Sequence, residues 1–200
     1  MTAPDQIKKI ASILHRDLLK INGFRKLGMT FTRNDEFPKI LNIQSSQWNN
    51  KDEAHFTINL GVYIDEVHKR SDAYPAGKNI KEYNCDLRER IGSLMSGGCD
   101  PWWKVVPNTD TEKLAAEVIQ TTSTYALPWF DRCNNMTEAA GIFEQSDPFK
   151  AAVAHLILGN TGKAAEFTRA AYTKGNRRIK QMIAEWARKN RIECFTEEHT

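Results

Sequence analysis

The chain has 200 residues, of which 40% are hydrophobic and 26% are charged, and its formal net charge is +3. These values are typical of a folded globular protein of one or two domains and exclude disordered and fibrous chains. No apolar run approaches the roughly 18 residues of a membrane-spanning helix, and the first residues lack the pattern of a secretory signal, so we expect a cytoplasmic protein without a membrane partner.

The first element in chain order is an amphipathic helix. Ile7, Ile10, Leu14 and Leu18 recur at intervals of three or four residues with charged residues between them. This spacing places the apolar side chains on one face of a helix, which we expect from about residue 4 to residue 21. Gly23 follows the last periodic residue, where a glycine commonly ends a helix.

Three segments then alternate apolar and polar residues, which indicates strands: residues 24–32, 39–46 and 54–64. The third segment is the most regular. Its apolar residues, such as Phe56 and Ile58, occupy one face, and its polar residues, such as Asn59, occupy the other. The short connections favour antiparallel pairing, with one face of the sheet covered.

The following segments have weaker patterns. Residues 65–85 show no clear period and are predicted to form a long loop. Residues 86–95 fit both a helix and a strand, and we prefer the strand. Gly97 and Gly98 predict a turn, and residues 102–106 predict a final strand that Pro107 ends.

After Pro107 the pattern is helical throughout. Thr109 and Glu112 have the spacing of a capping box, Pro128 is expected to kink or end the helix that follows, and Thr137 and Asp147 are placed to cap later helices. The sequence therefore predicts an α+β fold with an N-terminal helix, a mainly antiparallel sheet of four to five strands and a helical C-terminal half. We expect two domains, residues 1–135 and a helical extension of three to four helices at residues 136–200, in which residues 152–172 weakly resemble a tetratricopeptide helix pair.

Several short segments resemble one family of proteins. They are Phe24-Arg25-Lys26, Ile43-Gln44-Ser45-Ser46, the run from Phe56 to Val62, the run from Arg88 to Gly92, and Asp100 before Trp102-Trp103. In order and spacing, about residues 5–135 resemble domain-of-unknown-function family 4304, a bacterial family. The resemblance implies an α+β fold and a bacterial origin, and it implies no activity or catalytic residue.

The polar face of the predicted sheet carries the most informative group of residues. Amides and guanidinium groups there offer directional hydrogen bonds, arginine grips carboxylate or phosphate through paired bonds, and tryptophan supplies an apolar wall. We expect a binding module that recognises a protein or a small anionic ligand, although the same residues can instead hold loops in place. The candidate binding residues are Asn42, Gln44, Asn59, Tyr63, Arg88, Arg90, Trp102 and Trp103.

The positive charge is concentrated near the C-terminus. Residues 148–192 hold 10 Lys and Arg against two Glu, whereas the first 147 residues hold 18 basic and 20 acidic residues. Such asymmetry favours an anionic partner, so nucleic-acid binding by the last helices is an alternative function. The candidate residues for it are Arg177, Arg178, Lys180, Arg188 and Lys189.

A third hypothesis, an enzyme, has no motif to support it. The five histidines and four cysteines lack the spacing of a zinc site, and no phosphate-binding loop or nucleophile elbow is present. Acidic pairs such as Asp65 and Glu66 lie at predicted turns, where solvated carboxylates are common. We therefore assign no catalytic residue, no metal site and no cofactor, and the oligomeric state stays open.

Overall fold

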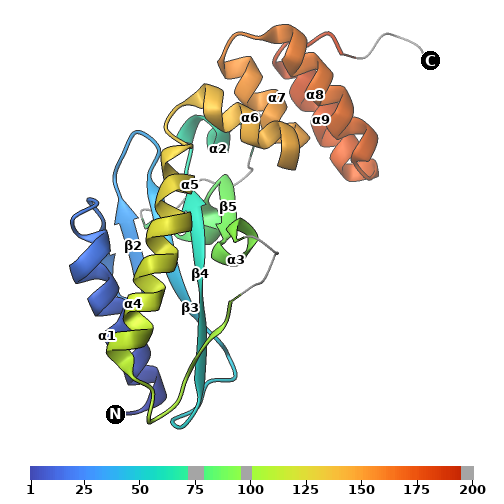
Figure 1. The fold of residues 1–200 in the computed structure, drawn as a ribbon. Coiled ribbons are helices and arrows are strands. Elements are labelled where there is room, and N and C mark those ends of the chain that lie inside the picture. The colour runs from blue at the N-terminus through green and yellow to red at the C-terminus, as the bar shows by residue number, and fades with distance from the viewer. Residues whose placement is uncertain (72–78, 96–100, 195–200) are drawn as a thin grey trace. The chain divides into compact units, whose positions relative to one another are not determined.

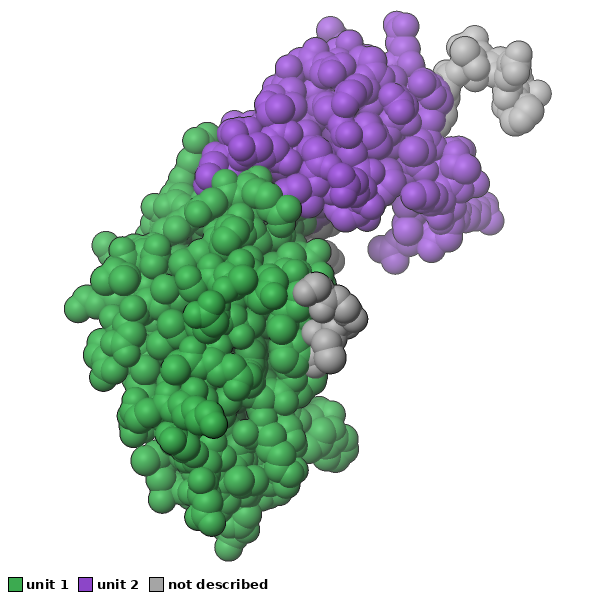
Figure 2. Space-filling model, viewed as in Figure 1, with its two compact units in different colours: residues 1–64, 76–132 green, residues 65–75, 133–200 purple. Residues whose placement is uncertain are grey.

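A computed structural model describes residues 1–71, 79–95 and 101–194 (Figure 1). The chain forms two compact units: residues 1–64 with 76–132, and residues 65–75 with 133–200 (Figure 2). Each unit therefore combines segments that are separate in the sequence. Units defined by packing need not coincide with domains, so the predicted boundary at residue 135 stays a prediction.

The first unit contains a six-stranded antiparallel sheet within the described residues. Its strands follow the order β1-β2-β3-β4-β5, and β6 also pairs with β4. The edge of β4 away from β3 pairs with β6 at Ala54–Phe56 and with β5 at Asn59–Val62. The strands are β1 (Arg25–Leu27), β2 (Thr30–Arg33), β3 (Lys39–Ser45), β4 (Ala54–Val62), β5 (Leu87–Arg90) and β6 (Trp103–Val105).

Helical segments complete the first unit and build the second. The first unit contains α1 (Ala3–Leu14), the π-helical η1 (His15–Leu19), the 3-10 helix η2 (Glu82–Asn84), α3 (Ile91–Leu94), α4 (Thr111–Thr121), the π-helical η3 (Thr122–Ala126) and α5 (Leu127–Asp131). The second unit contains α2 (Asp65–Ser71), α6 (Met136–Ser146), α7 (Pro148–Ile157), α8 (Thr161–Lys174) and α9 (Arg177–Lys189). These elements confirm the predicted N-terminal helix, antiparallel sheet and helical C-terminal half, with six strands in place of four to five.

The core of the first unit lies between the sheet and helices α1 and α4, which pack against each other (Figure 1). The sheet contributes Phe56, Ile58 and Leu60 to this core, and each of these side chains is fully buried. We call the side of the sheet that carries them the covered face. The opposite side, which carries Asn42, Asn59 and the other residues of that pleat, is the polar face.

The single strand predicted for residues 24–32 is wrong, because the segment is a hairpin. Leu27 pairs with Thr30 across a tight turn, and β1 and β2 run antiparallel. Gly28 in this turn has a φ of +63°, in the left-handed region that glycine adopts without a steric penalty. The turn reverses the chain inside a run whose apolar alternation looked continuous.

The loop predicted for residues 65–85 is also wrong in part. Asp65–Ser71 form helix α2, Glu82–Asn84 form η2, and residues 72–78 lie outside the described residues. Residues 86–95 contain both of the weighed alternatives, because strand β5 ends at Arg90 and the short helix α3 follows it. The turn predicted at Gly97 and Gly98 also lies outside the described residues.

Two predicted helix caps are wrong by one or two residues. Asp110, rather than Thr109, accepts the hydrogen bond from the Lys113 backbone at the start of α4. Asn135, rather than Thr137, has the same role at α6. Each helix begins at the polar residue whose own backbone is extended, which is the geometry that side-chain capping needs.

Pro128 neither ends nor interrupts the helical path at its own position. The backbone widens into the π-helical η3 just before it, and α5 then continues to Asp131. Proline has no backbone N–H and its ring clashes with the preceding turn, so a wider turn ahead of it lets the chain stay helical. Asp147 caps α7 as predicted.

The second unit buries apolar side chains between its helices. Helix α2 packs against α7, and its Val67 is fully buried. Helix α9 buries Ile183 and Ala187, whereas Ile179 and Met182 are 42% and 43% exposed. The apolar side chains of α9 are therefore only partly buried within the described residues.

Candidate functional site

A row of polar side chains crosses four strands on the polar face. Thr30 on β2 pairs with Asn42 on β3, Asn42 pairs with Asn59 on β4, and Asn59 pairs with Arg90 on β5. Paired residues in a sheet point to the same side, so this register alone brings the four side chains together. Gln44 lies two residues along β3 and extends the row.

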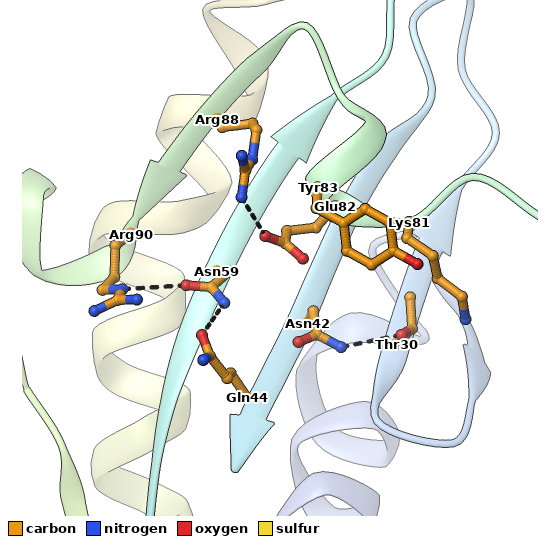
Figure 3. A pocket seen from close by; sticks show the side chains of 9 residues that line it. All are labelled: Thr30, Asn42, Gln44, Asn59, Lys81, Glu82, Tyr83, Arg88 and Arg90. Carbon is orange, nitrogen blue, oxygen red and sulfur yellow. Dashed lines mark hydrogen bonds and ion pairs between the residues drawn. The ribbon is translucent and has the colours of Figure 1, made fainter. Parts of the chain in front are cut away.

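Hydrogen bonds link these side chains to one another (Figure 3). Arg90 Nε donates to Asn59 Oδ1 at 3.3 Å, and Asn59 Nδ2 donates to Gln44 Oε1 at 2.6 Å. Asn42 Nδ2 donates to Thr30 Oγ1 at 3.1 Å. The amide orientations are therefore fixed before any ligand arrives, which lowers the entropy cost of binding.

The segment around η2 forms a wall beside this row. It lies close to β4 because Gly61 has no side chain: a Cβ built there would lie 2.6 Å from Cys85 Sγ and 2.8 Å from Cys85 Cβ. Cys85 packs with Ile40 and Tyr63 in a small buried cluster under the segment. The close approach of the two backbones places the side chains of η2 over the polar face.

Row and wall border an open cavity of about 450 Å³. Its charged residues are three cations, Lys81, Arg88 and Arg90, and one carboxylate, Glu82. Arg88 donates to Glu82 Oε1 at 2.9 Å, so this pair is neutral as a whole. The cavity therefore has a net positive charge and many amide donors. The lining residues are Thr30, Asn42, Gln44, Asn59, Lys81, Glu82, Tyr83, Arg88 and Arg90 (Figure 3).

The structure brings six of the eight predicted binding residues together. Five line the cavity: Asn42, Gln44, Asn59, Arg88 and Arg90. The sixth, Trp102, lies beside them, with its ring centroid 5.8 Å from the Arg90 guanidinium carbon. Whether these residues bind a ligand stays a prediction.

The other two predicted residues lie elsewhere. Tyr63 is on the expected face of β4, but it is only 6% exposed because the η2 segment covers it. Trp103 lies on the covered face, where its ring stacks on Phe56 and its Nε1 donates to Glu117 Oε1 at 2.8 Å. Trp102 and Trp103 are neighbours in sequence and therefore point to opposite sides of the strand.

Sequence reasoning missed four residues of the lining: Thr30, Lys81, Glu82 and Tyr83. Thr30 was placed inside a continuous strand, so its pairing with Asn42 was not anticipated. The other three belong to the aperiodic segment that was predicted as loop. A lysine and a tyrosine shortly before the arginines of β5 were the available signal.

The basic residues predicted for nucleic-acid binding lie on or at the ends of α9. Arg177, Arg178, Arg188 and Lys189 are exposed, and Lys180 Nζ lies 5.3 Å from the centroid of the Tyr172 ring. Exposed cations on one helix are common on solvated surfaces. Nucleic-acid binding by this helix stays a prediction.

Residues 1–71, 79–95 and 101–194 contain neither a candidate metal site nor a candidate membrane-spanning helix. No group of three His, Cys, Asp or Glu side chains there is arranged to hold a metal ion. Among the helices of the same residues, none has the length and apolar character needed to cross a membrane.

Residues 15–132 match the model of a protein family described as a domain of unknown function, DUF4304. The match spans more than half of the chain. The chain belongs to the DUF4304 family. All nine residues that line the cavity lie within the DUF4304 match, so the cavity is a feature of this domain. No curated protein and no solved structure shows significant similarity to the chain.

Proposed function

We propose that the polar face of the DUF4304 domain binds a small anionic ligand. The observation that carries this proposal is that Lys81, Arg88 and Arg90 line one cavity, and that Glu82 is the one carboxylate among its described lining residues. Cations that line one hollow raise the positive potential there, and this potential attracts anions. An anionic ligand therefore fits the charge of this lining.

The remaining lining residues support a carboxylate or phosphate as the anionic group. Guanidinium groups bind both through two parallel hydrogen bonds, and the amide nitrogen of Gln44 adds a neutral donor. Among the described lining residues there is neither a histidine nor a cysteine, which are the common bases and nucleophiles of enzymes. The set of side chains is therefore better suited to binding than to covalent chemistry.

Isothermal titration with inorganic phosphate, citrate and succinate tests this proposal. Arg90→Ala and Arg88→Ala are expected to weaken the binding of the best of these anions about tenfold or more, because each removes a charged donor. Arg16→Ala is the matched control. Arg16 is an exposed arginine on η1 whose partner is the adjacent Asp17.

Thermal melting of the same variants separates binding from folding. We expect melting temperatures close to that of the original protein together with weakened binding. The proposal fails if none of the three anions binds, or if Arg16→Ala weakens binding as much as Arg90→Ala does. It also fails if the two cavity variants melt far below the original protein, because the arginines would then serve the fold.

A further inference from the structure

A second cavity, of about 590 Å³, adjoins the first on the same unit. Two tryptophans dominate it: Trp48 is 82% exposed and Trp102 is 37% exposed. Exposed tryptophans that border a polar hollow commonly mark a binding site, since their burial in a complex is strongly favourable. The lining residues are Gln44, Ser45, Ser46, Gln47, Trp48, His55 and Trp102.

The two cavities have one lining side chain in common. Gln44 lines both of them. Arg90 lines the first and Trp102 the second, and the Arg90 guanidinium carbon lies 5.8 Å from the Trp102 ring centroid. A ligand with an anionic group among the cations therefore has an aromatic surface directly beside that group.

The turn that carries Trp48 is held in place. Asn49 Oδ1 accepts from the His55 backbone N–H at 2.7 Å, and Asn49 Nδ2 donates to the His55 carbonyl at 3.0 Å. The Trp48 backbone N–H donates to Ser46 Oγ at 3.2 Å. These bonds tie the turn to β4, so the backbone that carries the exposed ring is preorganised.

The side chains around Trp48 and Trp102 can donate and accept hydrogen bonds. Gln44 uses its carbonyl oxygen to accept from Asn59, which leaves its amide nitrogen to donate toward a ligand. Ser46 and His55 add further donors and acceptors to the lining. A planar ring whose edge carries nitrogen and oxygen atoms fits such a border better than a hydrocarbon ring does.

We infer that the ligand of the polar face is a nucleoside monophosphate, with its phosphate at Arg90 and Arg88 and its base against Trp102 and Trp48. This inference rests on the proposed anion binding and names the class of anion. Stacking of a base on an aromatic side chain contributes about 1–3 kcal/mol, and paired hydrogen bonds from arginine hold the phosphate. Neither cavity alone offers both contacts.

Titration with matched ligands tests the inference. The probes are AMP, GMP, CMP and UMP, with ribose 5-phosphate as the ligand that has the phosphate without the base. We expect at least one of the four nucleotides to bind about tenfold more tightly than ribose 5-phosphate, and the corresponding nucleoside to bind more weakly than its monophosphate. Quenching of tryptophan fluorescence should accompany nucleotide binding.

Variants assign the two contacts separately. Trp102→Ala and Trp48→Ala are expected to weaken the preferred nucleotide about fivefold or more while leaving ribose 5-phosphate within twofold, and Trp48→Phe should restore most of the lost affinity. Arg90→Ala should weaken both ligands. Circular dichroism of each variant checks that it is folded.

Three results would overturn the inference. If ribose 5-phosphate binds as tightly as all four nucleotides, or if the tryptophan variants change nothing, the ligand is an anion without a base and the proposed anion binding survives. If an eight-residue RNA binds far more tightly than any monophosphate, the site is built for a strand. If neither the nucleotides nor inorganic phosphate, citrate and succinate bind, the proposed function fails as well.

Discussion

The two faces of the sheet differ in what their side chains contact, although both are formed by alternate residues of the same strands. On the covered face, Phe56, Ile58 and Leu60 are fully buried against the helices. On the polar face, their neighbour Asn59 is hydrogen-bonded to Gln44 and Arg90 beside an open cavity. Successive residues of β4 thus serve the core and the candidate site in turn.

Because of this difference, we expect some substitutions in this domain to change its stability and others to change its ligand binding. Removing apolar atoms from the covered face leaves a cavity in a close-packed core, whereas removing a charged group from the polar face leaves a gap that water fills. Substitutions on the two faces should therefore differ in their effect on the free energy of unfolding. Four of them test the comparison.

The largest effect is expected for Phe56→Ala on the covered face. Phe56 is fully buried, and its ring centroid lies 5.3 Å from that of Trp103. The substitution should lower the free energy of unfolding by about 3–5 kcal/mol, because it removes a large ring from a packed core. Urea unfolding measures the change, and a loss of less than about 1 kcal/mol would contradict the assignment of the core.

Gly61→Ala tests a place on the polar face where packing is tight. The added methyl group would lie 2.6 Å from Cys85 Sγ, so η2 must shift away from β4. We expect a loss of about 1–3 kcal/mol and weakened anion binding, since η2 carries part of the cavity wall. Gly141→Ala in α6 is the control, because nothing lies within 4 Å of its added Cβ. Similar effects of the two substitutions would refute this role of Gly61.

Asp35→Asn tests the one buried charge of the covered face, Lys39. Lys39 is 1% exposed, and its Nζ lies 2.7 Å from Asp35 Oδ2. Without the carboxylate the ammonium loses a charged partner, so we expect a loss of about 1–2 kcal/mol at pH 7. Asp17→Asn, at an exposed pair with Arg16, is the control and should change stability much less than Asp35→Asn does.

The pH dependence of Asp35→Asn gives a second check. Burial acts to raise the pKa of Asp35, but the hydrogen bond and charge of Lys39, together with Arg33, outweigh it and hold the pKa below its ordinary value of 3.8. A lowered pKa stabilises the folded protein above pH 3.8, and this contribution is lost as the pH falls through the folded value. The stability difference between the original protein and the variant should therefore shrink below pH 3.8, and a constant difference would argue against the ion pair.

Arg88→Ala should have the smallest effect on stability. The Arg88 side chain is 53% exposed and pairs with Glu82 at the edge of the cavity. The Glu82 side chain is only 11% exposed and loses this partner, so the free energy of unfolding should fall by no more than about 1 kcal/mol. A larger loss, measured by urea unfolding, would mean that the polar face also supports the fold.

The strictly alternating parts of the sheet were predictable, and so was the core of the site. Asn42, Gln44 and Asn59 were placed on one face from the period of two alone, because β3 and β4 are long and paired along their whole length. Arg88 and Arg90 joined them once residues 86–95 were interpreted as a strand, of which the structure has Leu87–Arg90. In a regular strand, the spacing of two residues in the sequence decides whether their side chains point to the same side. These residues could therefore be assigned to one face.

The parts that could not be predicted depend on contacts between distant segments. Tyr63 has the right parity for the polar face, but η2 covers it, and nothing in the local pattern shows that a segment twenty residues later returns there. Lys81, Glu82 and Tyr83 come from that same segment. The assignment of Trp103 to the site failed because the register of β6 against β4 decides which of two adjacent tryptophans faces the helices.

Helix α2 is synthesised well before the helix against which it packs. It leaves the ribosome between β4 and β5, yet its buried Val67 belongs with α7, which is made about 80 residues later. Domains generally fold as their segments emerge, so α2 has to wait with an uncovered apolar side chain until the C-terminal helices appear. A truncated polypeptide that stops at the end of α5 would keep this helix without its partner, and would be more prone to aggregate than the complete chain.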